Sequence, residues 1–300
     1  MVARLEDESL FHLEIQAQNN DDICYRMGIY CLMIAVQLGT IDCDSMIYMQ
    51  LGAVTYNVLK DWDLPTIIRN LQTAGYAAVE LRTGHKHGVE PTLNPAERQK
   101  VKQQFEASKV RLLSYGSTCE FHSPDPEVRK KNIAIGKEFI DLAHDTGAWA
   151  VKVRPNGLPK EVPQQTTIDN IGAALRELGE FGGGKGVEIW MEVHGTATQV
   201  PPVAAAIMRA AKHEQVGLCW NSNPTDVVNG SVKQSFDLLR PWIKNCHINE
   251  LTSGYPYREL FSLLRQSKYE RYTLCEAQES KEPERFLSYY RALWTELNRA

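Results

Sequence analysis

Val187-Glu-Ile-Trp-Met-Glu192-Val-His194 is the first of four apolar runs in the second half of the chain that carry a polar residue at or near their end. The other three are Val216-Gly-Leu-Cys-Trp-Asn221, Ile243-Lys-Asn-Cys-His247 and Tyr272-Thr-Leu-Cys-Glu276. The steps between the four polar residues are 29, 26 and 29 residues, about the length of one strand, one helix and two loops. Because a barrel builds its active site from polar residues at the C-terminal ends of its strands, this stretch predicts four strand–helix units whose polar ends meet.

The same alternation of short apolar runs and amphipathic stretches extends back to residue 51. Asp63 before the helix-starting Pro65 and Asn94 before Pro95 are typical N-cap signals. The predicted strands are residues 52–57, 78–81, 110–115, 148–153, 188–193, 217–220, 243–248 and 271–275. The predicted helices are residues 64–74, 95–108, 126–146, 167–181, 202–211, 232–239, 257–266 and 283–297. This strict alternation predicts an α/β protein with a single-domain (β/α)8 TIM barrel.

A doubly wound sheet would also alternate strands and helices. It usually has fewer strands and often carries a glycine-rich phosphate-binding turn after the first strand. Here the first predicted strand is followed by Asn57-Val-Leu-Lys-Asp-Trp62, which lacks such a turn. The glycine-rich run Gly182–Gly186 follows a helix, so we interpret it as a flexible helix end. We therefore prefer the barrel.

Composition excludes several classes of protein. The 300 residues are 43% hydrophobic and 23% charged, which is ordinary for a globular protein. A net charge of −4 offers no basic excess for a phosphate backbone, so we predict no nucleic-acid partner. The seven cysteines show no CxxC spacing. We interpret Cys219, Cys246 and Cys275 as small buried hydrophobes and expect a cytoplasmic protein.

The first 50 residues do not follow the barrel pattern. They begin acidic and amide-rich, and the apolar stretch Ile29–Val36 is too short to cross a bilayer, so no membrane partner is expected. Three interpretations stay open: an extension packed on the barrel, a degenerate export signal, or an upstream start codon before Met46 and Met49. We predict an N-terminal extension, residues 1–50, followed by the barrel, residues 51–300.

Glu192 and Glu276 are the predicted catalytic residues, because they end strands that face each other across half of the barrel mouth. Two facing carboxylates suit paired proton transfer, in which each serves one face of a carbon. A bound cation would keep both ionised and polarise a substrate carbonyl or hydroxyl. The alternative for Glu192 is a structural salt bridge with Lys152 or Arg154 on the preceding strand.

A divalent-metal site is predicted from the same strand ends. His247 is the best single candidate ligand, and its alternative is a core histidine bonded to the backbone. Asn221 is the weakest, because an amide oxygen binds a cation less tightly than a carboxylate, and its alternative is a turn residue. The predicted metal ligands are Glu192, Asn221, His247 and Glu276. Oxygen-rich ligation favours Mn²⁺ or Mg²⁺, with Zn²⁺ or Co²⁺ as alternatives.

Other polar residues follow the earlier strands and are predicted to form a partly basic mouth. Such a mouth suits sugar hydroxyls or a phosphate. His194 shares a strand face with Glu192 by alternation. The alternative for each of these residues is a solvated loop. The predicted substrate-binding residues are Arg82, His85, His122, Lys152, Arg154, His194 and Asn249.

Taken together, these motifs resemble the xylose-isomerase-like TIM-barrel superfamily, the sugar phosphate isomerase/epimerase family, over about residues 51–297. The family pattern implies a metal held by Glu, Asp, His and Glu, and in its ketose 3-epimerase branch the two glutamates are also the acid/base pair. Carried over, it implies these roles for Glu192, His247 and Glu276. Asn221 replaces the usual aspartate, and Pro224 stands where the epimerases often have a second histidine. The chain lacks a His-x-His arrangement after His247, so the DNA-repair branch ranks low.

The resemblance implies a metal-assisted isomerase or epimerase that acts on a sugar or sugar derivative by proton transfer next to a carbonyl, in carbohydrate metabolism. The expected partner is a small-molecule sugar, and a homo-oligomer stays open. One alternative is a sugar or inosose dehydratase, a lyase using the same enolate chemistry. Another is a non-catalytic sugar-binding barrel with a weakened metal site, which the neutral Asn221 motivates.

Overall fold

A computed structural model describes residues 2–4, 10–12 and 49–299. The chain divides between residues 47 and 48, and the two parts are described separately. In the first part, β1 (Val2–Arg4) pairs antiparallel with β2 (Leu10–His12). The predictions made for the rest of the N-terminal 48 residues lie outside the described residues. The proposed extension, export signal and start-codon alternatives therefore stay predictions.

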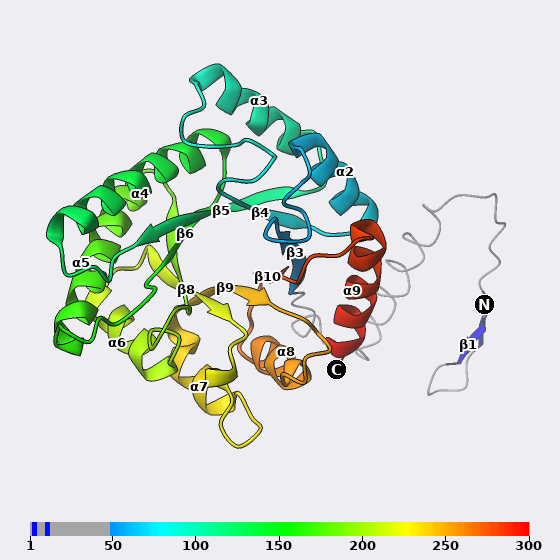
Figure 1. Cartoon of the computed structure of the whole chain (residues 1–300). Helices are drawn as coiled ribbons and strands as arrows, with labels where there is room; N and C mark the ends of the chain where they lie inside the picture. Colours follow the sequence, from blue (N-terminus) through cyan, green and yellow to red (C-terminus); the bar gives the residue numbers. More distant parts are fainter. Residues whose placement is uncertain (1, 5–9, 13–48, 300) are drawn as a thin grey trace. The chain divides into compact units, whose positions relative to one another are not determined.

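The second part is a closed barrel of parallel strands in the order β10-β3-β4-β5-β6-β7-β8-β9 (Figure 1). Strands that are consecutive in the chain pair with each other, and β10 closes the barrel against β3. The strands are β3 (Gln50–Val54), β4 (Ala78–Arg82), β5 (Arg111–Glu120), β6 (Ala150–Arg154), β7 (Glu188–Glu192), β8 (Val216–Asn221), β9 (Ile243–Ile248) and β10 (Tyr272–Cys275). The predicted TIM barrel is confirmed.

Helices follow the strands and surround the barrel (Figure 1). They are α2 (Leu64–Ala74), α3 (Pro95–Glu106), α4 (Pro126–Thr146), α5 (Gln164–Gly183), α6 (Pro201–Ala211), α7 (Lys233–Leu239), α8 (Tyr257–Gln266) and α9 (Pro283–Leu297). Short 3-10 turns occur at η2 (Pro224–Asp226) and η3 (Arg240–Trp242). No helix among the described residues is both long and apolar enough to cross a membrane.

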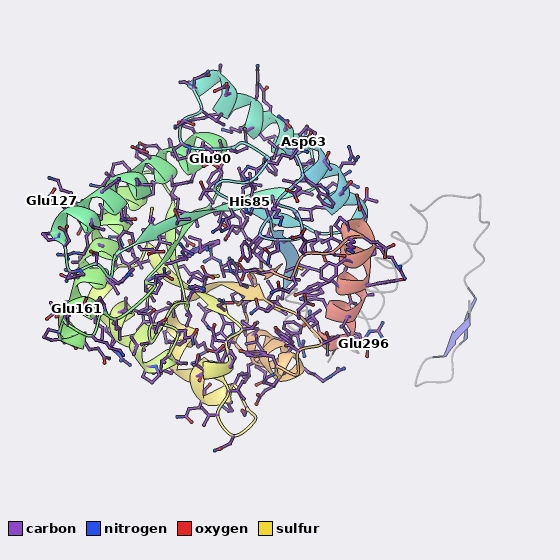
Figure 2. The ribbon with its side chains drawn as sticks, in the orientation of Figure 1. Asp63, His85, Glu90, Glu127, Glu161 and Glu296 are labelled. Carbon is purple, nitrogen blue, oxygen red and sulfur yellow. The ribbon has the colours of Figure 1, made fainter. Side chains whose placement is uncertain are left out.

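The predicted helix starts have the expected cap geometry. Asp63, at the outer edge of the barrel domain (Figure 2), accepts a hydrogen bond from the backbone of Thr66. Asn94 and Glu97 form a reciprocal capping box at the start of α3. Gly75 ends α2 in the left-handed conformation at φ 74°, where a side chain would be strained.

Most elements differ from their predicted bounds by one to three residues, and for β5 and α5 the structure shows the reason. β5 continues to Glu120, five residues beyond its predicted end, and pairs there with Arg154. α5 continues through Gly183, so it includes the first glycines of the run that we interpreted as a flexible end. A side chain at Gly182 would collide with the backbone oxygen of Val187. These glycines therefore permit close packing of α5 on β7.

Strand alternation divides the inside of the barrel into an apolar lower layer and a charged upper layer. On three strands, a residue of the lower layer stands two positions before a residue of the upper layer: Ala78 before Glu80, Ala150 before Lys152, and Trp190 before Glu192. The lower layer is a separate core cluster of Val54, Ala78, Leu113, Ala150, Trp190, Cys219, Tyr272 and Leu274. Burying a side chain as large as Trp190 stabilises the fold by about 2–3 kcal/mol.

The three strand cysteines are buried, as predicted. Cys219, Cys246 and Cys275 are free thiols inside the core. Burial raises the pKa of the Cys219 thiol to about 11. Cys219 belongs to the core cluster inside the barrel, and Cys246 and Cys275 belong to the cluster that includes the helices. All three act as small apolar side chains.

Candidate active site

The upper layer brings the four predicted metal ligands to the C-terminal end of the barrel. Glu192 ends β7, Asn221 ends β8, His247 lies on β9, and Glu276 follows β10 directly. Glu192, Asn221 and His247 are buried, and 15% of the Glu276 side chain is exposed. Four consecutive strands thus supply one side chain each, as the spacing predicted.

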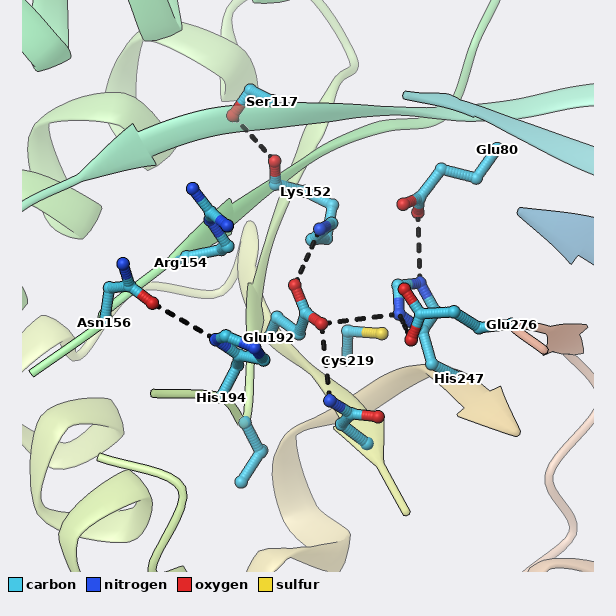
Figure 3. Close-up of polar contacts among 12 residues, drawn as sticks. Glu80, Ser117, Lys152, Arg154, Asn156, Glu192, His194, Cys219, His247 and Glu276 are labelled. Atoms are coloured by element: carbon cyan, nitrogen blue, oxygen red, sulfur yellow. Dashed lines mark hydrogen bonds and ion pairs between the residues drawn. The ribbon is translucent and has the colours of Figure 1, made fainter. Parts of the chain in front are cut away.

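His247 is the centre of this group (Figure 3). Its Nδ1 atom lies 3.6 Å from Glu192 Oε1 and 3.3 Å from Glu276 Oε2. One donor atom from each of the three residues lies within 4.8 Å of the other two. Carboxylates this close repel each other, and a cation among them would remove that repulsion. The three side chains can therefore hold a metal ion.

Glu80 fixes the orientation of the His247 ring. Its Oε2 atom lies 3.4 Å from His247 Nε2 and accepts a hydrogen bond from Ser114 Oγ at 2.8 Å. With a proton on Nε2, the Nδ1 lone pair faces the glutamates, which is the tautomer that a metal ligand needs. Burial raises the pKa of Glu80, but His247 and Lys152 lower it more, so the net direction is down.

Sequence analysis did not name Glu80 as a site residue. The signal was present, because Glu80 is a carboxylate inside the apolar run Ala78–Leu81 and shares a strand face with Arg82. The structure also explains Gly116 on β5, since a Cβ atom there would lie 2.8 Å from Glu80 Oε1. Glycine at that position leaves room for the buried carboxylate.

Lys152 is the salt-bridge partner of Glu192. Its Nζ atom donates a hydrogen bond to Glu192 Oε2 at 2.6 Å, and both side chains are buried. Burial works against ionisation of Glu192, but the Lys152 ammonium and His247 hold its pKa well below the usual range. Burial lowers the pKa of Lys152, but the negative charges of Glu192, Glu80 and Glu276 raise it more. The net shift is upward, so Lys152 stays protonated. One Glu192 oxygen is thus occupied, and Oε1 faces the other ligands.

Asn221 is the fourth member of the group, and its amide side chain carries no charge. Its Nδ2 atom donates to Glu192 Oε1 at 3.4 Å, a long hydrogen bond. Its Oδ1 atom and His247 Nδ1 are both buried without a hydrogen-bond partner. An unpartnered amide oxygen beside two carboxylates is unusual in a folded protein, and a bound cation would satisfy it together with His247 Nδ1. The residues present therefore fit a divalent metal.

The side-chain hydrogen bonds that form the turn after β8 come from Asn223 rather than from Asn221. Asn223 donates from its side chain to the Val193 and Asn221 backbone oxygens at 2.6 and 3.0 Å. It also forms a capping box with Asp226 over η2. Asn221 is thereby left as the last residue of the strand, with its side chain in the site.

A cavity of about 640 Å³ opens in front of this group. Among the predicted residues, it is lined by Arg82, Lys152, Arg154, Glu192, His194, Asn221, Asn249 and Glu276. Two predicted substrate-binding residues are not part of this lining. The Nδ1 atom of His85 lies 2.9 Å from Thr55 Oγ1, and His122 packs on Gly157. Both follow strand ends in loops, where strand alternation does not fix the direction of a side chain.

A network around Glu120 holds two residues that line the cavity, Arg154 and His194. Arg154 Nη2 donates to Glu120 Oε1 at 2.7 Å, and Asn156 donates to the same oxygen. Asn156 Oδ1 lies 3.1 Å from His194 Nδ1 (Figure 3). Arg154 is therefore paired with Glu120, and Lys152 is the base that reaches Glu192.

Sequence analysis also missed the contribution of the loops after β8 and β9. Tyr255, between β9 and α8, lines the cavity and donates to Asp226 Oδ2 at 2.9 Å. Trp220 Nε1 donates to Tyr255 Oη at 3.2 Å. Burial raises the pKa of Asp226 to about 7 against two hydrogen bonds that lower it. The spacing of strand ends carries no information on this contact, because it joins two loops.

The family to which this fold and site belong is shown by comparison with known proteins. The model of the xylose isomerase-like TIM barrel family matches residues 68–291. The chain belongs to this family, and the resemblance inferred from the strand ends is confirmed. A comparison with curated protein sequences found no match.

Solved structures share the fold at low sequence identity. D-psicose 3-epimerase from Clostridium cellulolyticum H10 is 13% identical, with a TM-score of 0.72 over 84% of this chain and 100% of that one. The IOLI protein with a bound zinc atom is 16% identical, with a TM-score of 0.66 over 83% and 96%. A "probable 3-DHS dehydratase" from Bacillus anthracis is 13% identical, with a TM-score of 0.68 over 82% and 99%. At these identities the similarity shows a common fold.

Proposed function

We propose that this protein is a metal-assisted epimerase or isomerase that acts on a sugar or sugar derivative. One observation carries the proposal: donor atoms of Glu192, His247 and Glu276 lie within 4.8 Å of one another beside a cavity of about 640 Å³. Family membership and the structural similarity to a D-psicose 3-epimerase support it. Mn²⁺ and Mg²⁺ suit the oxygen-rich donors, and Zn²⁺ or Co²⁺ are the alternatives.

The metal would be held by Glu192 Oε1, Asn221 Oδ1, His247 Nδ1 and Glu276 Oε2. When bound, it would polarise a substrate carbonyl or hydroxyl. Glu80 holds the His247 ring through Nε2, 3.4 Å away, so that Nδ1 stays available. Lys152 holds the other oxygen of Glu192 at 2.6 Å. The protein thus fixes the ligands before substrate arrives.

Glu192 and Glu276 are the proposed proton-transfer pair. Glu276 is the more exposed of the two, at 15% against 4% for the Glu192 side chain. In the forward direction Glu276 removes the proton from the carbon next to the carbonyl, and the C–H electrons move into an enolate. Glu192, on the other side of the site, serves the opposite face of the same carbon. Glu192 takes a proton from the Lys152 ammonium, 2.6 Å away, and gives it to that face of the enolate. This inverts the carbon, and the pair exchanges roles in the reverse direction.

Hydrogen exchange with solvent tests this proposal directly. The protein is loaded with Mn²⁺ and incubated in D₂O with a panel of ketoses, their phosphates and ketose acids, and uptake of deuterium at carbon is measured. We expect exchange with at least one member and a loss of about 100-fold or more in Glu276→Gln and Glu192→Gln. Glu177→Gln is the matched control, because Glu177 pairs with Lys137 on the surface of α5. Unchanged exchange in both site variants would refute the acid/base assignment.

A dehydratase is a second catalytic candidate, since the same enolate could expel a hydroxide from the adjacent carbon. The structural similarity to the Bacillus anthracis protein favours keeping it. Product mass separates the two reactions. Epimerisation or isomerisation leaves the mass unchanged, and dehydration lowers it by one water.

A non-catalytic sugar-binding barrel is favoured by a different observation. Lys152 lies 2.6 Å from Glu192 and neutralises its charge, and Asn221 is itself neutral. Two of the four donor residues therefore add little electrostatic attraction for a cation. A protein that binds a sugar, holds no metal and exchanges no carbon-bound hydrogen would fit this candidate.

A further inference from the structure

Three basic side chains line the cavity, and two of them are paired with carboxylates. Lys152 lies 2.6 Å from Glu192, and Arg154 lies 2.7 Å from Glu120. Arg82 is different: within the described part of the chain, no carboxylate oxygen lies within 4.0 Å of its guanidinium. Counting only contacts with the described residues, the cavity therefore contains one cationic group, Arg82, whose charge no carboxylate neutralises directly.

The backbone and guanidinium of Arg82 are held in place by surrounding groups. Its backbone N–H donates to Thr55 Oγ1 at 2.9 Å, and its carbonyl oxygen lies 2.9 Å from the buried His87 Nε2. The guanidinium lies over the ring of Tyr56, 5.1 Å from the centroid, and Nη1 makes a 3.4 Å hydrogen bond to the Thr83 carbonyl. Stacking leaves the edges of a guanidinium free to donate.

The carboxylate carried by the same loop is already occupied. Glu90 accepts hydrogen bonds from Thr83 Oγ1 at 2.6 Å and from the Gly84 backbone at 2.7 Å. Figure 2 shows Glu90 farther from the barrel centre than His85. The His85 ring stacks on the Tyr56 ring, with the two centroids 6.5 Å apart. The loop after β4 thus directs its carboxylate away from the cavity and leaves Arg82 at its wall.

Arg82 lies across the barrel from the proposed chemistry. In the circular strand order, β4 stands opposite β8, and the strands flanking β8 carry Glu192 and His247. A substrate whose reacting carbon lies between the two glutamates would extend its far end toward β4. The Arg82 guanidinium would meet that end inside the same cavity.

We infer that the substrate is an anionic sugar derivative whose carboxylate or phosphate is bound by Arg82. This inference rests on the proposed function for the location of the reacting carbon. The planar fork of a guanidinium matches both anions with two parallel hydrogen bonds, and these charge-assisted bonds are about twice as strong as neutral ones. A neutral sugar would leave the cationic fork without a partner of opposite charge.

Calorimetric titration of the metal-loaded full-length protein at low salt tests the inference. The probes are D-fructose, D-fructose 6-phosphate and D-fructuronate, which share a ketose and differ in charge. We expect one anionic sugar to bind at least 10-fold more tightly than fructose in the wild type, and Arg82→Gln to remove that preference. A 10-fold change corresponds to about 1.4 kcal/mol. The 6-phosphate and the uronate distinguish a phosphate from a carboxylate.

The controls separate charge from fold. Arg82→Lys keeps the charge without the fork and should retain part of the preference. Arg69→Gln should retain all of it, because Arg69 bonds to Asn70 and Thr66 on exposed α2. Inorganic phosphate and acetate, titrated alone, probe the guanidinium without a sugar. An anion preference that survives in Arg82→Gln, equal binding of fructose and both anionic sugars, or no Arg82-dependent binding of any anion would each overturn the inference.

Hydrogen exchange of the wild type with the same three sugars separates this inference from the proposed reaction. Anion preference without exchange by any probe would support the Arg82 site and count against the epimerase. Exchange with neutral and anionic ketoses at equal affinity would support the epimerase and overturn the Arg82 site.

Discussion

A single amide determines the charge of the proposed metal site. Asn221 stands on β8 with an unpartnered Oδ1 atom, between Glu192 and His247. A carboxylate in its place would add a negative charge and a stronger ligand for a divalent cation. The neutral side chain instead donates to Glu192 Oε1 at 3.4 Å. The strength of metal binding is therefore the property of this site most sensitive to one residue.

We predict that Asn221→Asp binds Mn²⁺ at least 10-fold more tightly than the wild type, and that His247→Ala loses the metal. The measurement is elemental analysis of protein purified without an affinity metal, followed by Mn²⁺ titration. Asn249→Asp is the matched control, because it adds the same charge in the cavity outside the donor set. Equal metal content in the wild type and His247→Ala would place any bound metal elsewhere.

Glu80 acts on the metal through His247, so it is a positioning residue. We predict that Glu80→Gln lowers metal affinity by about 10–100-fold, which is the usual effect of removing a ligand's hydrogen-bond partner. Excess metal should restore turnover in this variant. Glu120→Gln is the control, because Glu120 bonds to Arg154 and Asn156 instead. Identical Mn²⁺ affinities for the wild type and Glu80→Gln would refute this role.

The strand-end residues could be predicted from sequence because one rule covers them. Alternation with period two and a repeat of 26 to 29 residues place Glu192, Asn221, His247 and Glu276 on one end of the barrel. The same rule could not decide which base pairs with Glu192, since Lys152 and Arg154 share a strand face. Burial distinguishes the two bases. Lys152, with 5% of its side chain exposed, lies deeper and pairs with Glu192, whereas Arg154, with 21% exposed, pairs with Glu120.

At the scale of whole elements, the loop between β9 and α8 is joined to η2 by a buried acid. Asp226 accepts from Tyr255 Oη at 2.9 Å and from the Asn223 backbone at 2.8 Å, both at Oδ2. Its Oδ1 atom is buried without a partner. Because Tyr255 lines the cavity, this contact connects the stability of two loops to the shape of the site.

The raised pKa of Asp226, about 7, predicts a pH-dependent stability. In the unfolded chain the group ionises near 3.8, so between pH 4 and pH 7 the unfolded state has lost a proton that the folded state still holds. The free energy of unfolding therefore falls as pH rises through this window and is constant above it. The total loss is at most about 4 kcal/mol, since one pKa unit is worth about 1.4 kcal/mol.

We predict that Asp226→Asn removes this loss, because its amide oxygen can still accept from Tyr255 and Asn223. Urea unfolding of the metal-free protein at pH 4.5, 6 and 7.5 should show the variant gaining stability over the wild type as pH rises. Asp237→Asn is the control, since Asp237 pairs with Lys233 on the surface. Parallel stability curves for the wild type and Asp226→Asn would show that Asp226 does not titrate in this window.

Element lengths were harder to predict than element types. β5 extends to Glu120 because Glu120 pairs with Arg154 on β6, a contact that local sequence does not encode. α5 extends into Gly182 because β7 packs directly on it, where only a glycine fits. In both cases tertiary packing determines where the element ends. The loops that complete the cavity depend on the same kind of contact.

At the scale of the whole barrel, the two ends differ in how completely their charges are paired. At the N-terminal end, Glu188 binds Arg271 at 2.6 Å and Lys244 at 3.0 Å, and Arg271 lies over the ring of Trp190. At the C-terminal end, buried charges are incompletely paired. In TIM barrels the first end is associated with stability and the second with catalysis. The charged upper layer should therefore destabilise the metal-free protein.

Metal binding should then stabilise the entire barrel, because its ligands come from four neighbouring strands and β10 closes the barrel against β3. A ligand that binds only the folded state at 100 times its dissociation constant adds about 2.7 kcal/mol. For a domain of this size that raises the melting temperature by about 5 °C. We expect Mn²⁺ to produce this rise in the wild type and a larger one in Asn221→Asp. His247→Ala should show neither. An equal rise in all three proteins would mean that Mn²⁺ acts at the surface, and no rise in the wild type or Asn221→Asp would contradict a metal site between these strands.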